Sequence, residues 1–297
     1  MEGLMMEKIN IGKYVEAAIE WLSIKGAPVF DAINNGVEAL VEGFQNLLLA
    51  PHPLVVIFLI AALGYYLGAG RKNLLKRAGW KEAGGVLLFT IFGLLLLWGM
   101  NFWEETMQTL TLVIVSTLIA LLIGIPLGIW SARSDRAQRT IRPILDFMQT
   151  MPAFVYLIPA ILFFSVGNVP GVVATVVFAL PPGVRLTNLG IRSVPKEVVE
   201  AAYSFGSTPR QVLYKVQIPL AKPSILAGVN QVIMLSLSMV VIASMVGAAG
   251  LGEKVYTGIL KADIGLGFEA GLSIVILAII LDRISQSLGG TQKKESK

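Results

Sequence analysis

The chain has 297 residues, of which 55% are hydrophobic and only 14% charged, with a net charge of +5. Soluble domains carry about 25% charged residues, so one or two ordinary water-soluble domains are excluded. The sequence has no cysteine and one histidine, which rules out disulfides, thiolate nucleophiles and metal sites built on Cys or His clusters. We therefore expect no catalytic residue, no metal site and no cofactor held by this chain.

Residues 1–53 form the first expected element, an amphipathic helical region outside the membrane. Polar residues separate apolar ones that recur every three or four positions. A shorter set of this kind is Tyr14, Ala18 and Leu22. Such a helix would lie along the membrane interface. It would either brace the bundle, the alternative we prefer, or offer a docking platform to an external partner. The longer apolar set is Phe30, Ile33, Val37, Leu40, Val41, Phe44, Leu47 and Leu48.

Seven apolar segments follow in the sequence. A bilayer core about 30 Å thick needs roughly 20 apolar residues in a helix. We therefore expect an all-α polytopic membrane protein with about seven transmembrane helices, and a count of five to eight fits the same sequence. The first two spans, within 54–103, are expected to be accessory to a core domain at 104–285, with a tail at 286–297. The seven segments are 54–70, 85–103, 107–131, 148–167, 170–187, 224–246 and 266–282.

The positive charges predict the orientation. Most of the 24 Lys and Arg residues fall in alternate connections and in the tail. Basic connections lie on the cytoplasmic side, so the N-terminus should be outside and the C-terminus cytoplasmic. Glu2 and Glu7 argue against a cleaved signal peptide at the start. Because the cations alternate with apolar spans, we expect a lipid bilayer as partner and no nucleic acid, although basic loops can also bind RNA.

The expected spans contain few ionisable residues. Asp146, Arg185, Asp282 and Arg283 lie at span ends. Ion-coupled carriers usually keep such residues inside their spans, so uphill transport would need energy from outside the bilayer. Amides and hydroxyls within spans should mostly form helix–helix hydrogen bonds, with pore lining as the alternative. These residues are Gln149, Thr150, Asn230, Gln231, Ser236 and Ser238.

The loop at 190–222 predicts a bent pair of helices on the cytoplasmic side. Ser193 is a candidate N-cap with Pro195 in the first turn, and Gly206 can end that helix in a left-handed conformation. Thr208 and Gln211 form a capping box that starts the second helix. In the first helix, one face is expected to carry Val198, Ala201, Ala202 and Phe205, and the second helix is expected to end at Pro219 and Pro223.

This loop resembles the EAA loop of ABC importer permeases. The matching residues are Glu200, Ala201, Ala202 and Gly206, followed after nine residues by Val216-Gln217-Ile218-Pro219. The resemblance implies that the bent helices insert into a groove on an ATP-binding subunit. The alternative is a surface hairpin without a partner. The expected coupling residues are Glu200, Ala201, Ala202, Gly206 and Pro219.

A closer resemblance extends over about residues 85–285. The segments 146–164, 171–191 and 237–252 resemble the glycine betaine/proline betaine permeases of the ProW and OpuAB type. The resemblance implies a type I ABC importer permease fold, a homodimer, an extracytoplasmic substrate-binding protein and a bacterial cytoplasmic membrane. It also implies two ABC ATPase subunits that bind ATP and Mg. This chain has no G-x-x-x-x-G-K-[ST] segment, so we expect ATP hydrolysis on those separate subunits.

Other functions remain open on sequence alone. The cargo could be an amino acid or another osmolyte rather than a betaine, and an ATP-independent channel or secondary carrier, or a membrane-embedded enzyme, are more distant alternatives. The segment Gly247–Gly252 suits a re-entrant turn, a close contact with a docked partner or a flexible loop. Aromatic and thioether side chains could contact a quaternary ammonium, although such residues are more often core or lipid-facing. They are Phe147, Met148, Met151, Phe154, Tyr156, Met234, Met239 and Met245.

Overall fold

The computed structural model describes residues 11–73 and 77–288, and all regular structure in this part is helical. The acidic residues Glu2 and Glu7 and the tail from residue 289 onward lie outside the described residues, as do the side chains of Tyr14 and Ala18. In chain order the helices are α1 Ile11–Leu49, α2 Pro53–Asn73, α3 Arg77–Gly99, α4 Trp103–Arg133, α5 Asp135–Thr150, α6 Ala153–Phe164, α7 Asn168–Arg192, α8 Lys196–Ser204, α9 Pro209–Val212, α10 Ile218–Ala243, α11 Leu251–Lys261 and α12 Ile264–Leu288.

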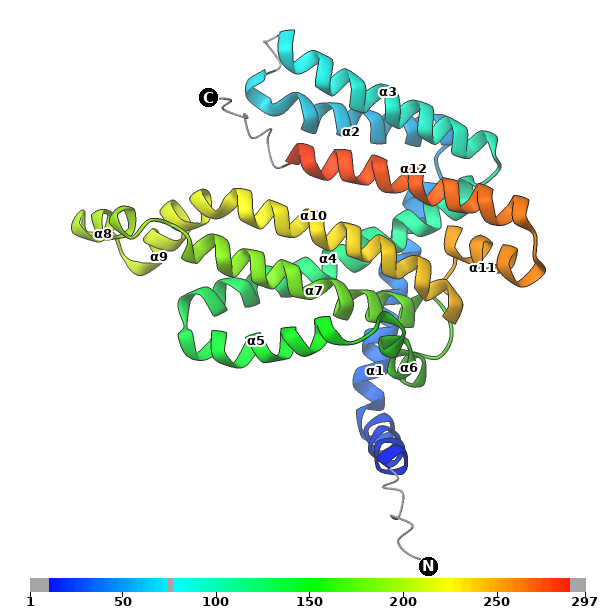
Figure 1. The fold of residues 1–297 in the computed structure, drawn as a ribbon, viewed down its shortest axis with the longest axis horizontal. Helices are drawn as coiled ribbons and strands as arrows, with labels where there is room; N and C mark the ends of the chain where they lie inside the picture. The colour runs from blue at the N-terminus through cyan, green and yellow to red at the C-terminus, as the bar shows by residue number, and fades with distance from the viewer. Residues whose placement is uncertain (1–10, 74–76, 289–297) are drawn as a thin grey trace, which may run out of the picture.

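The centre of the bundle is formed by α4, α7 and α10, which run side by side (Figure 1). Glycines permit this close packing. A Cβ added to Gly128 of α4 would lie 2.6 Å from the Cβ of Thr187, and one added to Gly190 of α7 would lie 2.7 Å from the Cβ of Ser224. Without an aqueous driving force between helices, membrane helices associate through such close contacts. The glycines therefore fix which faces of α4, α7 and α10 meet.

Helices α1, α2, α3 and α12 surround this centre. Helices α2 and α3 pack against each other and against α12, where Ile57, Leu94 and Ile280 form a separate apolar cluster. Helix α1 meets α2 at a bend of 103° and crosses the bundle at the end where α6 lies (Figure 1). Its residues Val37 and Val41 are buried against the main core.

The amphipathic pattern of the N-terminal region is confirmed as a helix, but its apolar residues do not form one buried face. Val37 and Val41 are buried, and Phe44 and Leu48 pack against the same core. Ile33, Leu40 and Leu47, spaced by seven residues, are exposed instead. The contacts of Val37 and Val41 agree with a bracing role, and the position of α1 outside the membrane remains a prediction.

The described chain offers four to six membrane spans, depending on how bent helices are counted. Four helices of the described chain are long and apolar enough to cross a membrane: α4, α7, α12 and the continuous helix Pro209–Val246. Two bent pairs, α1–α2 and α5–α6, raise the number to six if each pair counts as one span. The exact count of seven remains a prediction.

The expected continuous span at 148–167 is wrong. Helix α5 ends at Thr150, α6 begins at Ala153, and the two meet at 100°. Pro152 explains the break, because a proline disfavours helical geometry in the preceding residue, and Met151 is extended (φ −74°, ψ 135°). With 12 residues, α6 is about 18 Å long and cannot cross a bilayer core alone.

Candidate functional site: an exposed elbow and the two ends of the bundle

Residues 193–217 form an elbow that projects from one end of the bundle (Figure 1). Helix α8 has no buried residue, and α9 is followed by a π-helical turn at Leu213–Gln217 that continues into α10. The large apolar side chain of Phe205 is 91% exposed at the tip, and those of Val198 and Tyr203 are also exposed. A helix without buried residues gains little from packing within its own chain, so local capping must define its geometry.

The turn between α8 and α9 is a Schellman motif around Gly206. The backbone N–H of Gly206 donates to Tyr203 O (2.9 Å) and that of Ser207 donates to Ala202 O (3.1 Å). Gly206 has φ 78°, a left-handed conformation that glycine adopts without steric cost. The carbonyl of Ala202, the third residue of the matched motif, is therefore one of the two acceptors that hold the turn.

The second helix of the elbow starts as expected. Gln211 N–H donates to Thr208 Oγ1 (3.4 Å) while Thr208 N–H donates to Gln211 Oε1 (2.8 Å). Pro209 occupies the first helical position, where its missing N–H costs nothing. The capping box is thus confirmed.

Two details of the expected elbow are wrong. Ser193 does not cap α8: helix α7 continues to Arg192, and the Ser193 hydroxyl donates backward to Gly190 O (3.0 Å). Pro219 and Pro223 do not end the second helix but lie inside α10. The widened turn before them explains this, because Ile218 N–H donates to Leu213 O, five residues back, and a π turn absorbs a local mismatch in the hydrogen-bond ladder.

The expected coupling residues fall at two places. Glu200 and Ala201 are exposed on α8, Ala202 is half-buried and Gly206 is exposed at the turn. Glu200 also lines a cavity of about 220 Å³ beneath α8 together with Gln217 and Val194. Pro219 is exposed in the first turn of α10 and does not line this cavity. Near the end of the matched motif, Gln217 therefore shares a cavity with Glu200, whereas Pro219 does not.

Sequence reasoning missed two aromatic residues of the elbow, Tyr203 and Tyr214. Tyr214 is 64% exposed and borders a shallow groove with Trp130 and Arg133 of α4. The sequence could have indicated them, because both tyrosines lie in the polar connection between two expected spans. Aromatic side chains there have no hydrophobic core to pack into and are therefore expected at the surface. Tyr203 and Phe205 at the end of α8, and Tyr214 beside the groove with α4, are thus exposed aromatic side chains of the elbow.

Ion pairs fix the base of the elbow to α5. Arg192, the last residue of α7, pairs with Asp135 (Nη2–Oδ1 2.7 Å) and donates to Ser131 O (3.1 Å). Two helical turns earlier, Arg185 pairs with Asp146. Asp146 and Arg185 were expected at span ends, but they lie inside helices α5 and α7. The two ion pairs join α5 to α7 near both ends of α5. Helix α5 therefore lies beside the end of α7 from which the elbow starts.

The opposite end of the bundle carries a second glycine turn, residues 243–252, here called the far turn. Gly247 N–H donates to Ser244 O (3.1 Å) and Ala248 N–H to Ala243 O (3.3 Å), again a Schellman motif. Leu251 N–H donates to Thr109 Oγ1 (2.8 Å). A Cβ on Gly250 would lie 2.4 Å from that same oxygen. The far turn is therefore a packed segment and not a flexible loop.

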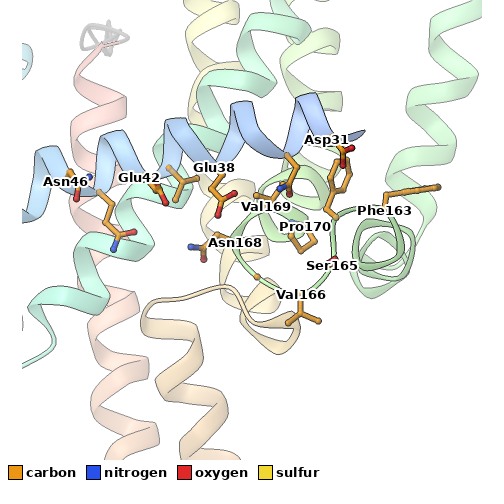
Figure 2. A pocket seen from close by; sticks show the side chains of 15 residues that line it. Asp31, Glu38, Glu42, Asn46, Phe163, Ser165, Val166, Asn168, Val169 and Pro170 are labelled. Atoms are coloured by element: carbon orange, nitrogen blue, oxygen red, sulfur yellow. The ribbon is translucent and has the colours of Figure 1, made fainter. Parts of the chain in front are cut away.

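A polar cleft of about 820 Å³ lies at this same end, between α1 and the connection from α6 to α7. Figure 2 shows Asp31, Glu38 and Glu42 of α1 facing Ser165, Val166 and Asn168 of the connection. Phe30 of α1 stacks on Phe163 with ring centroids 4.5 Å apart. Among the described residues, no group of three His, Cys, Asp or Glu side chains is close enough to hold a metal ion. The three carboxylates make the cleft acidic, and the stacking of Phe30 on Phe163 connects α1 to its opposite wall.

Comparison with known proteins identifies the family. Residues 124–289 match the binding-protein-dependent transport system inner membrane component. The chain is 54% identical to the glycine betaine/carnitine transport permease protein GbuB of Listeria monocytogenes over 90% of this chain and 91% of that protein. It is 45% identical to the glycine betaine transport system permease protein OpuAB of Bacillus subtilis over 98% of both. It is also 48% identical to the glycine betaine/proline betaine permease protein ProW of Escherichia coli, over 95% of this chain and 75% of that protein.

The fold agrees with this assignment. A solved structure of the MetNI methionine ABC transporter superposes with a TM-score of 0.56 at 24% identity, covering 61% of this chain and 93% of that chain. The matched family region contains α7, the elbow, α10 and α12. The chain therefore belongs to the family of binding-protein-dependent transport system inner membrane components, with the fold of an ABC importer permease.

Proposed function

We propose that this chain is the membrane-spanning permease of an ATP-driven importer for small methylated zwitterions such as glycine betaine and proline betaine. The names of the three relatives support this cargo. The complex would contain two copies of the chain, two ATPase subunits carrying ATP and Mg, and an extracytoplasmic binding protein. The chain itself would catalyse no reaction. The protein is a multi-pass component of the cytoplasmic membrane.

The exposed elbow is the observation that carries the proposal. It offers Phe205, Tyr203 and Val198 on a segment defined by its own caps. Apolar surface of this kind, rimmed by polar residues, is typical of a protein–protein contact. We assign it to the ATPase subunit, with Glu200, Ala201, Ala202 and Gly206 as the docking segment and Pro219 at the end of the motif. The elbow side would then be cytoplasmic, and the far turn and the cleft beside α1 would face the binding protein.

The domain division follows from the same assignment. In this proposal, residues 104–285 are the core permease and carry the coupling loop at 190–222. Residues 54–103 add two accessory helices, which contact the core mainly at α12. Residues 1–53 brace the bundle from outside, and 286–297 form a cytoplasmic tail.

The test is co-purification of the ATPase subunits with the permease. Phe205→Ala removes a side chain that is 91% exposed and should leave the fold intact. We expect loss of the ATPase from the purified complex and loss of ATP-driven uptake of labelled glycine betaine. Ile264→Ala is the matched control, because Ile264 is 86% exposed at the opposite end. Full retention of ATPase binding by the Phe205 variant would count against the elbow as docking site.

Uptake into vesicles separates the remaining functions. Labelled glycine betaine, proline betaine and an unmethylated amino acid should compete in that order of preference if the cargo is a betaine. Preferential uptake of the amino acid would indicate a different solute on the same architecture. Solute flux in vesicles that lack the ATPase would instead support a channel or secondary carrier.

A further inference from the structure

One face of α10 carries polar side chains that the bundle does not cover. Between residues 224 and 246, the exposed side chains are those of Ala227, Gln231, Ser238 and Met245. They follow one another at steps of four, seven and seven residues, so they form a single stripe along the helix and the turn after it. We call these four residues the α10 stripe.

The neighbours of α10 explain why this face stays open. Gly228 and Val232 point to α7, where a Cβ on Gly228 would lie 3.1 Å from that of Leu186. Asn230 points to α12 and donates to Asp282 Oδ1 (3.4 Å). Gln231 lies about 100° around the helix from both Asn230 and Val232. The contacts with α7 and α12 therefore turn the α10 stripe away from its own bundle.

The chemistry of the α10 stripe differs from that of a lipid-facing surface. In the middle of α12 the exposed side chains on one face are Phe268, Leu272, Val275 and Ile279, all large and apolar. Exposed charged and amide side chains are confined to the ends of this helix, at Glu269, Arg283 and Gln286. On α10, by contrast, two of the four exposed residues are an amide and a hydroxyl. Ser238 satisfies its hydroxyl by donating to Met234 O (3.0 Å). A glutamine amide has no such local solution, and its exposure to hydrocarbon is costly.

We propose that the α10 stripe lines the water-filled path through which the solute crosses the membrane, with Gln231 and Ser238 as its polar contacts. This inference rests on the proposed function, because only a permease needs such a path. The Gln231 amide can donate to a carboxylate, and the thioether of Met245 can contact methyl groups of a quaternary ammonium. Binding by so few groups is weak, as release from a path requires.

The same geometry separates the three methionines considered from the sequence that lie on α10 or in the turn after it. Met245 is exposed on the α10 stripe, Met234 is half-buried beside it, and Met239 is fully buried. Of these three, Met245, with support from Met234, can therefore touch a solute in the path. Met239 packs in the core instead.

Cysteine labelling of the assembled transporter in vesicles tests the proposal. Because the chain has no cysteine, Gln231→Cys and Ser238→Cys each introduce its only thiol. The probe is a membrane-impermeant methanethiosulfonate with a trimethylammonium group. Val232→Cys and Met239→Cys are the matched buried controls, one residue further along and 0% exposed. Val275→Cys on the apolar face of α12 is the lipid-facing control.

We expect the cysteines at 231 and 238 to react at least about tenfold faster than the three controls, since a buried or lipid-covered thiol must first become exposed. Reaction should block uptake, and excess glycine betaine should slow it. Equal rates at 231 and 275 would overturn the proposal in favour of lipid. A spontaneous disulfide-linked dimer of Gln231→Cys without labelling would overturn it in favour of a contact between two copies. Uptake by the parent transporter, which carries no introduced cysteine, reports on the proposed function separately.

Discussion

The elbow and the far turn use the same backbone device at opposite ends of the molecule. Gly206 and Gly247 both hold the left-handed position of a Schellman motif, with φ of 78° and 88°. Their surroundings differ. A Cβ on Gly206 would meet nothing within 4 Å, whereas one on Gly247 would lie 2.6 Å from Val166 Cγ1. Glycine is required by backbone conformation alone at the elbow, and by conformation and packing together at the far turn.

This difference separates two kinds of constraint. The far turn is held by its own chain, because Asn168 Oδ1 accepts from Ala249 N–H (2.9 Å). Just after the turn, Lys254 of α11 pairs with Glu105 of α4 (3.1 Å). The elbow has no comparable contacts along α8, which buries no residue. A turn whose shape is set by its own hydrogen bonds and is not covered is suited to a partner that arrives from outside. Substitutions should therefore damage the fold at the far turn and assembly at the elbow.

Gly250→Ala should have the largest effect on stability. Gly250 has φ 123° and ψ −161°, a region almost restricted to glycine, and a Cβ there would lie 3.1 Å from Thr109 N and 3.2 Å from Glu105 O. Strain and overpacking together should cost about 2–6 kcal/mol. The yield of monodisperse protein in detergent measures this loss. Gly43→Ala, on the exposed side of α1 with nothing within 4 Å, should behave as the parent, and equal yields of both variants would contradict the packing argument.

Gly206→Val should abolish transport while leaving the permease folded. A β-branched residue in the left-handed region costs about 1–2 kcal/mol and would shift the angle between α8 and α9. We expect normal yield, a small decrease in melting temperature, and ATP hydrolysis that no longer drives uptake. Gly206→Asn is the matched control, because asparagine tolerates this conformation and should retain most of the coupling. If the valine variant transports normally, the elbow does not act through its bend.

Thr109→Val should destabilise the far turn without affecting assembly with the ATPase. The substitution keeps the shape of the side chain but removes the acceptor for Leu251 N–H. A buried N–H without partner costs about 1–3 kcal/mol. The melting temperature of the purified permease should fall while co-purification of the ATPase stays unchanged. Thr140→Val, an exposed threonine on α5, serves as control and should not change the melting temperature.

Ala262→Gly should give the smallest effect, and a favourable one. Ala262 holds φ 52° at the end of α11, where Asp263 N–H donates to Gly258 O (2.9 Å) in a third motif of the same kind. Glycine removes the strain but increases the freedom of the unfolded chain, so we expect a gain of at most about 1 kcal/mol. A clear decrease in melting temperature would show that the alanine methyl group contributes packing that outweighs its backbone strain.

The caps of the elbow and the break in the bundle show what local sequence can predict. Gly206 and the Thr208–Gln211 capping box were predictable because each depends on residues at most five apart. The break at Pro152 is equally local. The apolar segment 148–167 is nevertheless long enough for a span, and its length favoured one helix where the structure has two. The π turn before Pro219 was not predictable, since no single residue type specifies it.

The coupling residues and the α10 stripe show the opposite limit. The resemblance to the EAA loop selected Glu200, Ala201, Ala202 and Gly206. In the structure all four lie on one projecting segment, where three are exposed and Ala202 is half-buried. The amides Asn230 and Gln231 are neighbours in sequence and chemically alike. Only their positions on α10 separate them, because Asn230 meets Asp282 while Gln231 faces away from the bundle.

Composition, apolar run lengths and capping patterns by themselves determined that this chain is a helical membrane protein with a bent, exposed segment between two spans. These properties follow from transfer free energies and from hydrogen bonds between residues close in sequence. The tertiary structure alone decided which face of each helix is covered. That depends on contacts such as Gly128 with Thr187 and Gly190 with Ser224, which join residues 59 and 34 positions apart in the printed sequence, and no local pattern encodes their rotation.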